Sequence, residues 1–133
     1  MIPEYDLAGK VIGLAMKVHS SLGTGFLESV YQKALEHELG KAGMRFESQK
    51  PLVVNYDGIL VGEFFADILV ENELIVELKA VQNLVSPHEV QTVNYLVPTG
   101  IDIGLLLNFG SERLEFKKKF REARPKVQTV TEP

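Results

Sequence analysis

Three charged residues lie within the two apolar runs of the segment EFFADILVENELIVELKA at residues 63–80: Asp67, Glu77 and Lys79. Paired carboxylates supply hard oxygen ligands, which suit Mg²⁺ or Mn²⁺. Such an ion lowers the pKa of a bound water, and a neighbouring lysine stabilises the negative charge of a phosphoryl transition state. These residue types therefore predict a divalent-metal site for phosphoryl transfer.

The geometry of this site depends on the turn between two predicted strands. A two-residue turn at Asn72-Glu73 would place Asp67 and Glu77 on opposite faces of the sheet. A three-residue loop from Glu71 to Glu73 instead pairs Asp67 with Glu77, with their Cβ atoms about 4.5–5.5 Å apart. We favour the three-residue loop because ENE is a credible polar loop, although a slip of one residue would destroy the site.

A pattern D-x₉-E-x-K is short and common, and by itself it favours a structural interpretation. Glu77 and Lys79 would then face solvent on a one-sided sheet, with Asp67 near the end of a strand. The metal interpretation has its own physical argument, since two carboxylates placed side by side repel each other unless something neutralises them. Other parts of the chain bear on the choice.

Five motifs along the chain form a recognisable set: VHSSLGTG at 18–25, GFLESVY at 25–31, ELKA at 77–80, HEVQTVNYL at 88–96 and GLLLNFG at 104–110. Together they resemble the PD-(D/E)XK nuclease superfamily. Within it, they resemble a small bacterial and archaeal group named for a GxxExxY motif, here Gly25, Glu28 and Tyr31. The resemblance covers nearly the whole chain. One departure is that the PD pair of the superfamily reads Ala66-Asp67 here.

The resemblance implies a role for each matching residue. Asp67 and Glu77 match the metal-binding acids, and Lys79 matches the catalytic lysine. Glu28 matches the acid on the first core helix, with a metal-binding or catalytic role; read alone, it is equally a helix-starting glutamate favoured by the helix dipole. Gln91 and Tyr95 match a Q-x₃-Y pattern that helps to orient the lysine and to contact substrate phosphate. Tyr95 alone would more often be core, whereas a buried Gln91 amide would need partners.

Hydrophobic periodicity predicts the elements that position these residues. The expected elements are helices at 6–22 and about 26–42, strand-like segments at 45–49, 51–56, 59–70 and 74–80, a helix from 86 to about 98, and strands at 101–109 and 113–120. Asp6 and Ser86 are the expected N-caps, with Glu89 completing a capping box, and Asp57-Gly58 is a hairpin turn. This order predicts an α/β (α+β) fold, a mixed sheet flanked by helices. The resemblance implies the restriction-endonuclease-like αβββαβ core.

Composition limits the classes to which the chain can belong. Its 133 residues, 45% apolar and 24% charged, suit one globular domain, expected at 1–125, with a flexible tail at 126–133. No apolar run reaches the roughly 18–20 residues that span a bilayer, so no membrane association is expected. The chain has no cysteine and starts with acids rather than a basic n-region, so we expect a cytoplasmic protein without a signal peptide.

The basic residues are unevenly distributed. Net charge is −4, but seven of the fourteen basic residues lie between residues 113 and 126. Lys117, Lys118, Lys119 and Arg121 are the candidate nucleic-acid contacts, because a local basic stripe binds phosphates even when the net charge is negative. The alternative is an edge strand kept soluble by its lysines, and the sequence does not separate the two.

These observations support two functions of different classes. The first is a Mg²⁺- or Mn²⁺-dependent nuclease acting on DNA, less favourably on RNA, as the resemblance implies. The second is a catalytically silent nuclease-like fold that serves as a nucleic-acid-binding or protein-interaction module. A homodimer is possible in either case, since it would enlarge the surface that contacts phosphate. His19 and His88 are not assigned catalytic roles; His19 lies near an apolar helix face, where a structural role is favoured.

Overall fold

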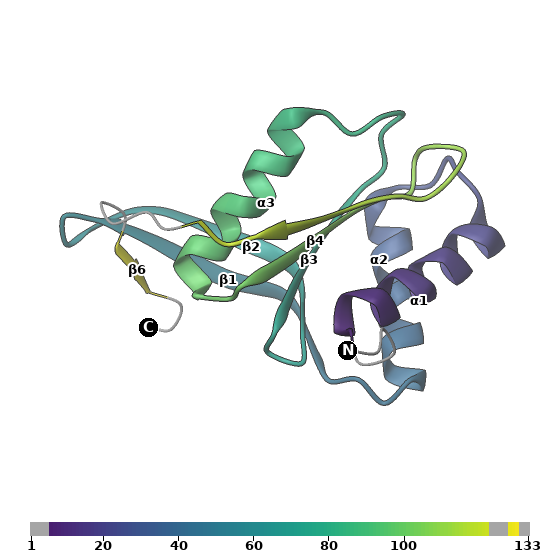
Figure 1. Ribbon diagram of the computed structural model, residues 1–133, viewed down its shortest axis with the longest axis horizontal. Helices are drawn as coiled ribbons and strands as arrows, with labels where there is room; N and C mark the ends of the chain where they lie inside the picture. Colours follow the sequence, from purple (N-terminus) through teal and green to yellow (C-terminus); the bar gives the residue numbers. More distant parts are fainter. Residues whose placement is uncertain (1–5, 123–127, 131–133) are drawn as a thin grey trace.

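The computed structural model describes residues 6–122 and 128–130 (Figure 1). Its elements are α1 (Leu7–Leu22), α2 (Glu28–Lys41), β1 (Phe46–Tyr56), β2 (Ile59–Val70), β3 (Leu74–Lys79), α3 (Ser86–Thr99), β4 (Ile103–Asn108), β5 (Glu115–Phe120) and β6 (Gln128–Val130). Strand β6 was not predicted: it occupies three residues of the expected tail and pairs with β1. The rest of that tail, residues 126–127 and 131–133, lies outside the described residues.

The strands form one mixed sheet in the order β5-β4-β3-β2-β1-β6. β3 and β4 are parallel and joined through α3, whereas the other neighbouring strands are antiparallel. In Figure 1, α1 and α2 lie together on one side of the sheet and α3 lies on the other. The predicted α+β fold with a mixed sheet is confirmed.

Two hydrophobic cores lie on opposite faces of this sheet. The α1/α2-side core joins helix residues Val11, Ala15, Tyr31 and Leu35 to Ile68, Val70, Val76, Leu78, Leu105 and Leu107 of the strands. The α3-side core joins Leu96 of α3 to Leu52, Ala66, Leu69 and Ile75. Gly104 lets α3 lie close to β4, because a Cβ at this position would press on side-chain atoms of Thr92 and Leu96.

The helices begin close to the predicted positions, with two corrections. Asp6 caps α1 as expected, its Oδ1 accepting from the backbone N–H of Ala8 at 3.1 Å. α2 begins at Glu28, two residues later than predicted, and its N-cap is Leu27, an exposed residue without a capping side-chain bond. The cap of α3 is Val85 and not Ser86, because His88 Nδ1 accepts the Val85 N–H at 3.2 Å.

The two hairpin turns agree with the sequence. Asp57 and Gly58 both have positive φ, at 54° and 77°, which is the geometry of a two-residue type I′ turn. The β2–β3 turn pairs Val70 with Leu74, so the three-residue loop is confirmed. The two strand-like segments before the first turn are one strand, β1.

Candidate functional site

Asp67 and Glu77 lie side by side where β2 and β3 stop pairing through their backbones. The last backbone pair is Ile68 with Val76. Beyond it, the N–H of Asp67 donates to Glu77 Oε2 at 2.9 Å, and the N–H of Leu78 donates to Asp67 Oδ2 at 2.8 Å. Each acid therefore accepts from the backbone of the opposite strand, and the predicted register places the two carboxylates together.

Glu77 faces α3 rather than α1 and α2. Ile75 belongs to the α3-side core, whereas Val76 and Leu78 belong to the α1/α2-side core. Side chains alternate along a strand, so Glu77 and Lys79 share the α3 face. The predicted grouping of the two acids with the lysine is therefore present in the fold.

Glu77 is a buried carboxyl with an unfavourable negative charge. Only 5% of its surface is exposed. Burial and the neighbouring charge of Asp67 raise the pKa of Glu77 to about 9, and this despite the Asp67 N–H and the Lys79 ammonium, which both lower it. A carboxyl in this environment ionises readily only when a cation is close to it.

Glu28 approaches the same place from the start of α2. The residue as a whole is exposed, but its carboxylate is partly desolvated, and burial raises its pKa. Lys79 and the backbone N–H of Ala80 lower that pKa, whereas the charge of Asp67 raises it. The structure thus brings the third predicted acid into electrostatic range of Lys79 and Asp67.

The GxxExxY residues position Glu28. The Tyr31 hydroxyl donates to the Gly23 carbonyl at 2.6 Å and accepts the Phe26 N–H at 3.3 Å, which fixes the loop before α2. Gly25 in this loop has a φ of +107°, which favours glycine. Tyr31 is fully buried, so it has a structural role in holding Glu28 at the start of α2.

The two predicted residues on α3 differ. Tyr95 stacks on Phe64 with ring centroids 4.3 Å apart. Its pKa is raised by burial and by the charges of Glu77 and Asp67, so it lies at the acid pair. Gln91 is exposed, and within the described residues its amide has no hydrogen-bond partner. Gln91 is therefore not a buried amide, and the argument that its burial demands partners does not apply.

The acid pair has the chemistry of a small divalent-cation site. Among the described residues, no cluster of three or more Asp, Glu, His or Cys side chains is arranged to hold a metal ion. Mg²⁺ is commonly held by one or two carboxylates, with water and substrate phosphate completing its coordination. Asp67 and Glu77 would supply those two carboxylates, and burial together with the charge of Asp67 raises the pKa of Glu77. The donor set fits a hard divalent cation.

Comparison with known proteins identifies the family of the chain. A family profile described as the PD-(D/E)XK nuclease superfamily matches residues 5–121. The chain belongs to this superfamily. A comparison with curated proteins found no match.

One solved structure with the same fold is the crystal structure of SSO0001. It superposes with a TM-score of 0.60 at 19% sequence identity, over 73% of this chain and 52% of that one. The chain therefore matches about half the length of SSO0001. At this identity the likeness shows the restriction-endonuclease-like fold and nothing about substrate.

Two glutamines that the sequence did not mark as site residues, Gln32 and Gln49, contact Asp67. Gln49 Nε2 donates to Asp67 Oδ1 at 3.3 Å and to Gln32 Oε1 at 3.1 Å. Gln32 Nε2 lies 2.9 Å from the Asp67 carbonyl oxygen. No motif in the sequence marks either residue, because both stand in ordinary polar positions of α2 and β1.

Asn108 fixes the chain that follows Lys79. It is fully buried, and its amide bonds both backbone groups of Val81: Oδ1 accepts from the N–H at 2.9 Å and Nδ2 donates to the carbonyl at 2.8 Å. Asn108 Nδ2 also donates to Glu115 Oε1 at 2.7 Å. Gly110 packs against the same segment, where a Cβ would overlap the Val81 backbone. A lone asparagine in an apolar run was the signal that could have revealed this role.

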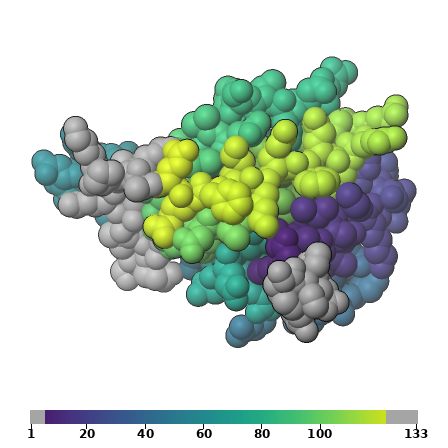
Figure 2. All heavy atoms as spheres, viewed as in Figure 1, coloured from purple at the N-terminus to yellow at the C-terminus, as the bar shows by residue number. Residues whose placement is uncertain are grey.

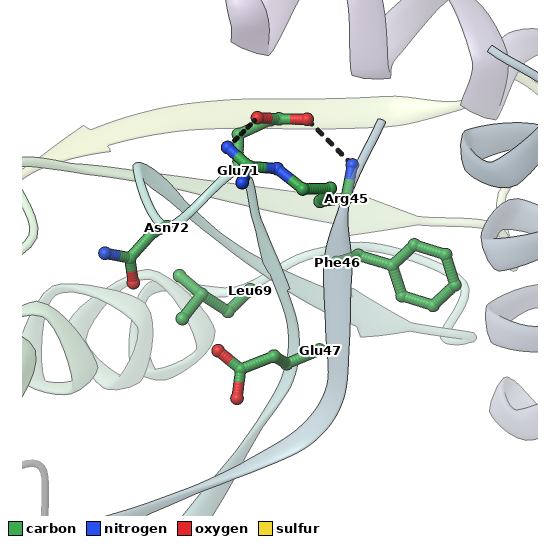
Figure 3. A pocket seen from close by; sticks show the side chains of 6 residues that line it. All are labelled: Arg45, Phe46, Glu47, Leu69, Glu71 and Asn72. Carbon is green, nitrogen blue, oxygen red and sulfur yellow. Dashed lines mark hydrogen bonds and ion pairs between the residues drawn. The ribbon is translucent and has the colours of Figure 1, made fainter. Parts of the chain in front are cut away.

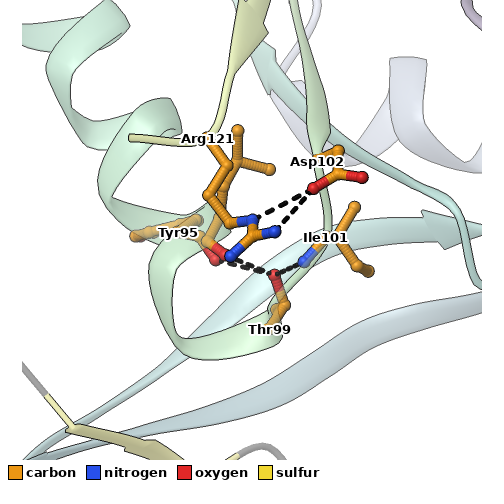
Figure 4. Close-up of polar contacts among 6 residues, drawn as sticks. Tyr95, Thr99, Ile101, Asp102 and Arg121 are labelled. Carbon is orange, nitrogen blue, oxygen red and sulfur yellow. Dashed lines mark hydrogen bonds and ion pairs between the residues drawn. The ribbon is translucent and has the colours of Figure 1, made fainter. Parts of the chain in front are cut away.

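The basic stripe lies on β5 and on Arg121 directly after it; β5 is an edge strand that crosses the face shown in Figure 2 between α3 and α1. Its charges are largely matched by acids. The observed ion pairs are Lys118 with Asp6 at 3.3 Å, Lys119 with Glu89 at 2.9 Å and Arg121 with Asp102 at 2.7 Å, the last drawn in Figure 4. Lys117 lies near Glu89 and Glu115, whose pKa values it helps to lower. These pairings favour the edge-strand interpretation over a free phosphate-binding surface.

The two histidines have structural contacts. His19 Nε2 lies 2.9 Å from the Ser111 carbonyl oxygen, and His88 caps α3 through Val85. The charge of His88 also lies near Glu28, whose pKa it lowers slightly. Neither contact gives a histidine a catalytic role.

A cavity of about 330 Å³ opens beside the β2–β3 turn (Figure 3). It is lined by Arg45, Phe46, Glu47, Leu69, Glu71 and Asn72, none of which is a predicted site residue. Glu71 closes one side by accepting from the backbone N–H of Arg45 at 2.7 Å and from its guanidinium at 3.2 Å.

Within the described part of the chain, every helix is too short or too polar to span a bilayer.

Proposed function

We propose that the chain is a Mg²⁺- or Mn²⁺-dependent nuclease that hydrolyses phosphodiester bonds in DNA, less favourably in RNA, and that it belongs to the GxxExxY group. The observation that supports this most is the placement of Asp67 and Glu77 side by side at the end of the β2–β3 ladder, where each carboxylate accepts a backbone N–H of the opposite strand and Lys79 lies within electrostatic range of Glu77. Membership of the nuclease superfamily supports the reaction class. The juxtaposition of the Asp67 and Glu77 carboxylates supports a divalent metal ion as the cofactor.

In this proposal each residue has a limited task. When bound, the metal ion supplies a water of lowered pKa and neutralises phosphate charge. Asp67 and Glu77 hold it, and Glu28 adds negative charge nearby as a third ligand or as a partner of Lys79. Lys79 stabilises the charge that develops on the phosphoryl oxygens. Tyr95 and Gln91, on the α3 side, contact the substrate phosphate or orient Lys79.

A calorimetric titration of Mn²⁺ tests this function without a guess about substrate. We expect saturable binding to the unmodified chain and its loss in Glu77→Ala. Glu63→Ala, which removes an exposed glutamate from the same hairpin, is the matched control and should bind normally. Binding would then justify assays on single- and double-stranded DNA and RNA. Mn²⁺-dependent cleavage that persists in Glu77→Ala would refute the assignment of the site.

The alternative is a silent nuclease-like module that binds nucleic acid or protein. The absence of a three-ligand metal cluster among the described residues favours it, whereas the ion pairs of β5 weaken its nucleic-acid form. Such a module would keep its affinity in EDTA and lose it when Lys117, Lys118 and Lys119 are neutralised. A nuclease would lose cleavage in EDTA.

We also propose that the chain forms a homodimer through its β1–β2 hairpin, which extends beyond the other elements in Figure 1. Five large apolar side chains on this hairpin are more than half exposed: Tyr56, Ile59, Leu60, Val61 and Phe65. Residues 51–77 contain no lysine or arginine, which disfavours nucleic acid as the partner of this surface. Analytical ultracentrifugation should give a dimer that Leu60→Asp dissociates and Val90→Asp, an exposed apolar site on α3, does not. A cytoplasmic location remains a prediction from composition.

A further inference from the structure

The β1–β2 ladder is interrupted at the pair that contains Asp67. Ser48 pairs with Ile68 and Lys50 pairs with Ala66, so Gln49 should pair with Asp67, but that pair is missing. Gln49 has a φ of +51°, in the left-handed region that disfavours residues with a side chain. It is the one residue of β1 with this conformation, and it stands opposite the predicted metal ligand.

The interruption changes which way β2 faces. Ala66 and Leu69 pack in the α3-side core, whereas Ile68 and Val70 pack in the α1/α2-side core. Residues two apart share a face in a regular strand, and Ala66 and Ile68 do not. The inside–outside alternation of β2 therefore reverses at Asp67, and its carboxylate direction is not fixed by a regular ladder.

Side chains replace the missing backbone pairing. Gln49 uses its amide nitrogen for two acceptors, Asp67 Oδ1 at 3.3 Å and Gln32 Oε1 at 3.1 Å. Gln32 Nε2 in turn lies within hydrogen-bonding distance of the Asp67 carbonyl at 2.9 Å, Glu36 Oε2 at 2.9 Å and Ser48 Oγ at 3.2 Å, of which its two hydrogens satisfy two at a time. Both Asp67 carboxylate oxygens are thus held, Oδ1 by Gln49 and Oδ2 by the Leu78 N–H.

We infer that Gln49, supported by Gln32, is a positioning residue that fixes the Asp67 carboxylate for cation binding. This inference rests on the proposed function. Each carboxylate oxygen has two lone pairs, so one on each remains available to a cation after these bonds form. The donor is a neutral amide, which orients the acid without placing a positive charge beside the ion. A left-handed residue at this position persists because the surrounding contacts require it.

Gln49→Gly separates positioning from folding. Glycine adopts the left-handed conformation without strain, so its thermal midpoint should equal or exceed that of the unmodified chain. Its Mn²⁺ affinity, measured by calorimetry, should fall at least tenfold, the effect typical of losing a group that orients a metal ligand. Asp57→Gly is the matched control: Asp57 also has a positive φ, of 54°, but it lies in the distal hairpin turn, so the variant should bind Mn²⁺ normally.

A double-mutant cycle gives a second measurement that needs no metal. In EDTA, Gln49→Gly and Asp67→Ala should be non-additive in the unfolding equilibrium constant by at least fivefold if the amide holds the carboxylate. Mn²⁺ affinity of Gln49→Gly within twofold of the unmodified chain, or an additive cycle, would overturn the inference. If the unmodified chain does not bind Mn²⁺, the proposed metal-dependent function fails instead, and the cycle alone decides whether Gln49 positions Asp67.

Discussion

Replacing Glu77 by glutamine should stabilise the metal-free protein at neutral pH. The pKa of Glu77 is raised to about 9 from an ordinary 4.5, chiefly by burial and then by the charge of Asp67. Between these two values the folded chain keeps a proton that the unfolded chain releases. The contribution of this proton to the free energy of unfolding is therefore fully present below pH 4.5 and is lost as the pH rises toward 9. This loss is the penalty that the native glutamate carries.

The size of the effect follows from this pKa. Each pH unit above 4.5 removes about 1.4 kcal/mol, so at pH 7.5 the penalty approaches about 4 kcal/mol, and relaxation around the site reduces it to about 2–4 kcal/mol. Glutamine carries no such penalty, and its carbonyl oxygen still accepts the Asp67 N–H. For a chain of this size the gain corresponds to a rise of roughly 6–12 °C in Tm.

Thermal unfolding followed by circular dichroism, in EDTA at pH 5 and pH 7.5, measures this gain. Glu77→Gln should be more stable than the unmodified chain at pH 7.5 and nearly equal to it at pH 5. Mn²⁺ should then raise the Tm of the unmodified chain and leave that of the variant unchanged, since a ligand stabilises only the form that binds it. Glu63→Gln, which alters an exposed residue, should change neither value. An equal or lower Tm for Glu77→Gln at pH 7.5 would refute the reasoning.

Three further substitutions test other parts of the fold and site. Lys79→Ala should lower kcat about 10²–10³-fold while Mn²⁺ binding, measured by calorimetry, is retained; lost binding would make the lysine structural. Gly110→Ala should destabilise by about 3 kcal/mol or more in urea unfolding, because its methyl group would overlap the Val81 backbone, and a near-neutral effect would contradict that packing. Tyr31→Phe should cost about 1–2 kcal/mol through the lost bond to the Gly23 carbonyl, which the same urea experiment measures.

The acid pair could be predicted from the sequence because its position depends on local rules. A three-residue turn is enough to set the register that brings Asp67 opposite Glu77, and the observed pairing of Val70 with Leu74 has that register. The cap of α3 depends on a choice between adjacent residues, and local rules were insufficient there. Ser86 is a good N-cap by type, but the His88 side chain caps one residue earlier.

Whether the lysines and the arginine of the basic stripe are paired with acids could not be predicted, because counting charges along the sequence does not identify their partners. Lys118 pairs with Asp6 from the other end of the chain, and Lys119 pairs with Glu89 of α3. These pairs form only when β5 lies at the edge of the sheet, where it is near the start of α1 and near α3. Exposed pairs of this kind contribute little to stability, but they reduce the charge available to a phosphate.

The contact of Gln49 with Asp67 could not be predicted for a different reason. No local sequence feature favours a left-handed glutamine within a strand. Its conformation follows from Asp67, whose surroundings replace backbone pairing by side-chain bonds on both edges of β2, to Gln49 on one side and to Glu77 and Leu78 on the other. The two acids are therefore not equivalent. Asp67 maintains the strand junction, so its loss should weaken both the fold and the site. Glu77 is a buried carboxyl that the folded, metal-free chain must keep protonated at neutral pH, so an amide there should strengthen the metal-free fold while it removes a ligand. A stability gain that accompanies a loss of metal binding is the signature of an acid retained for chemistry.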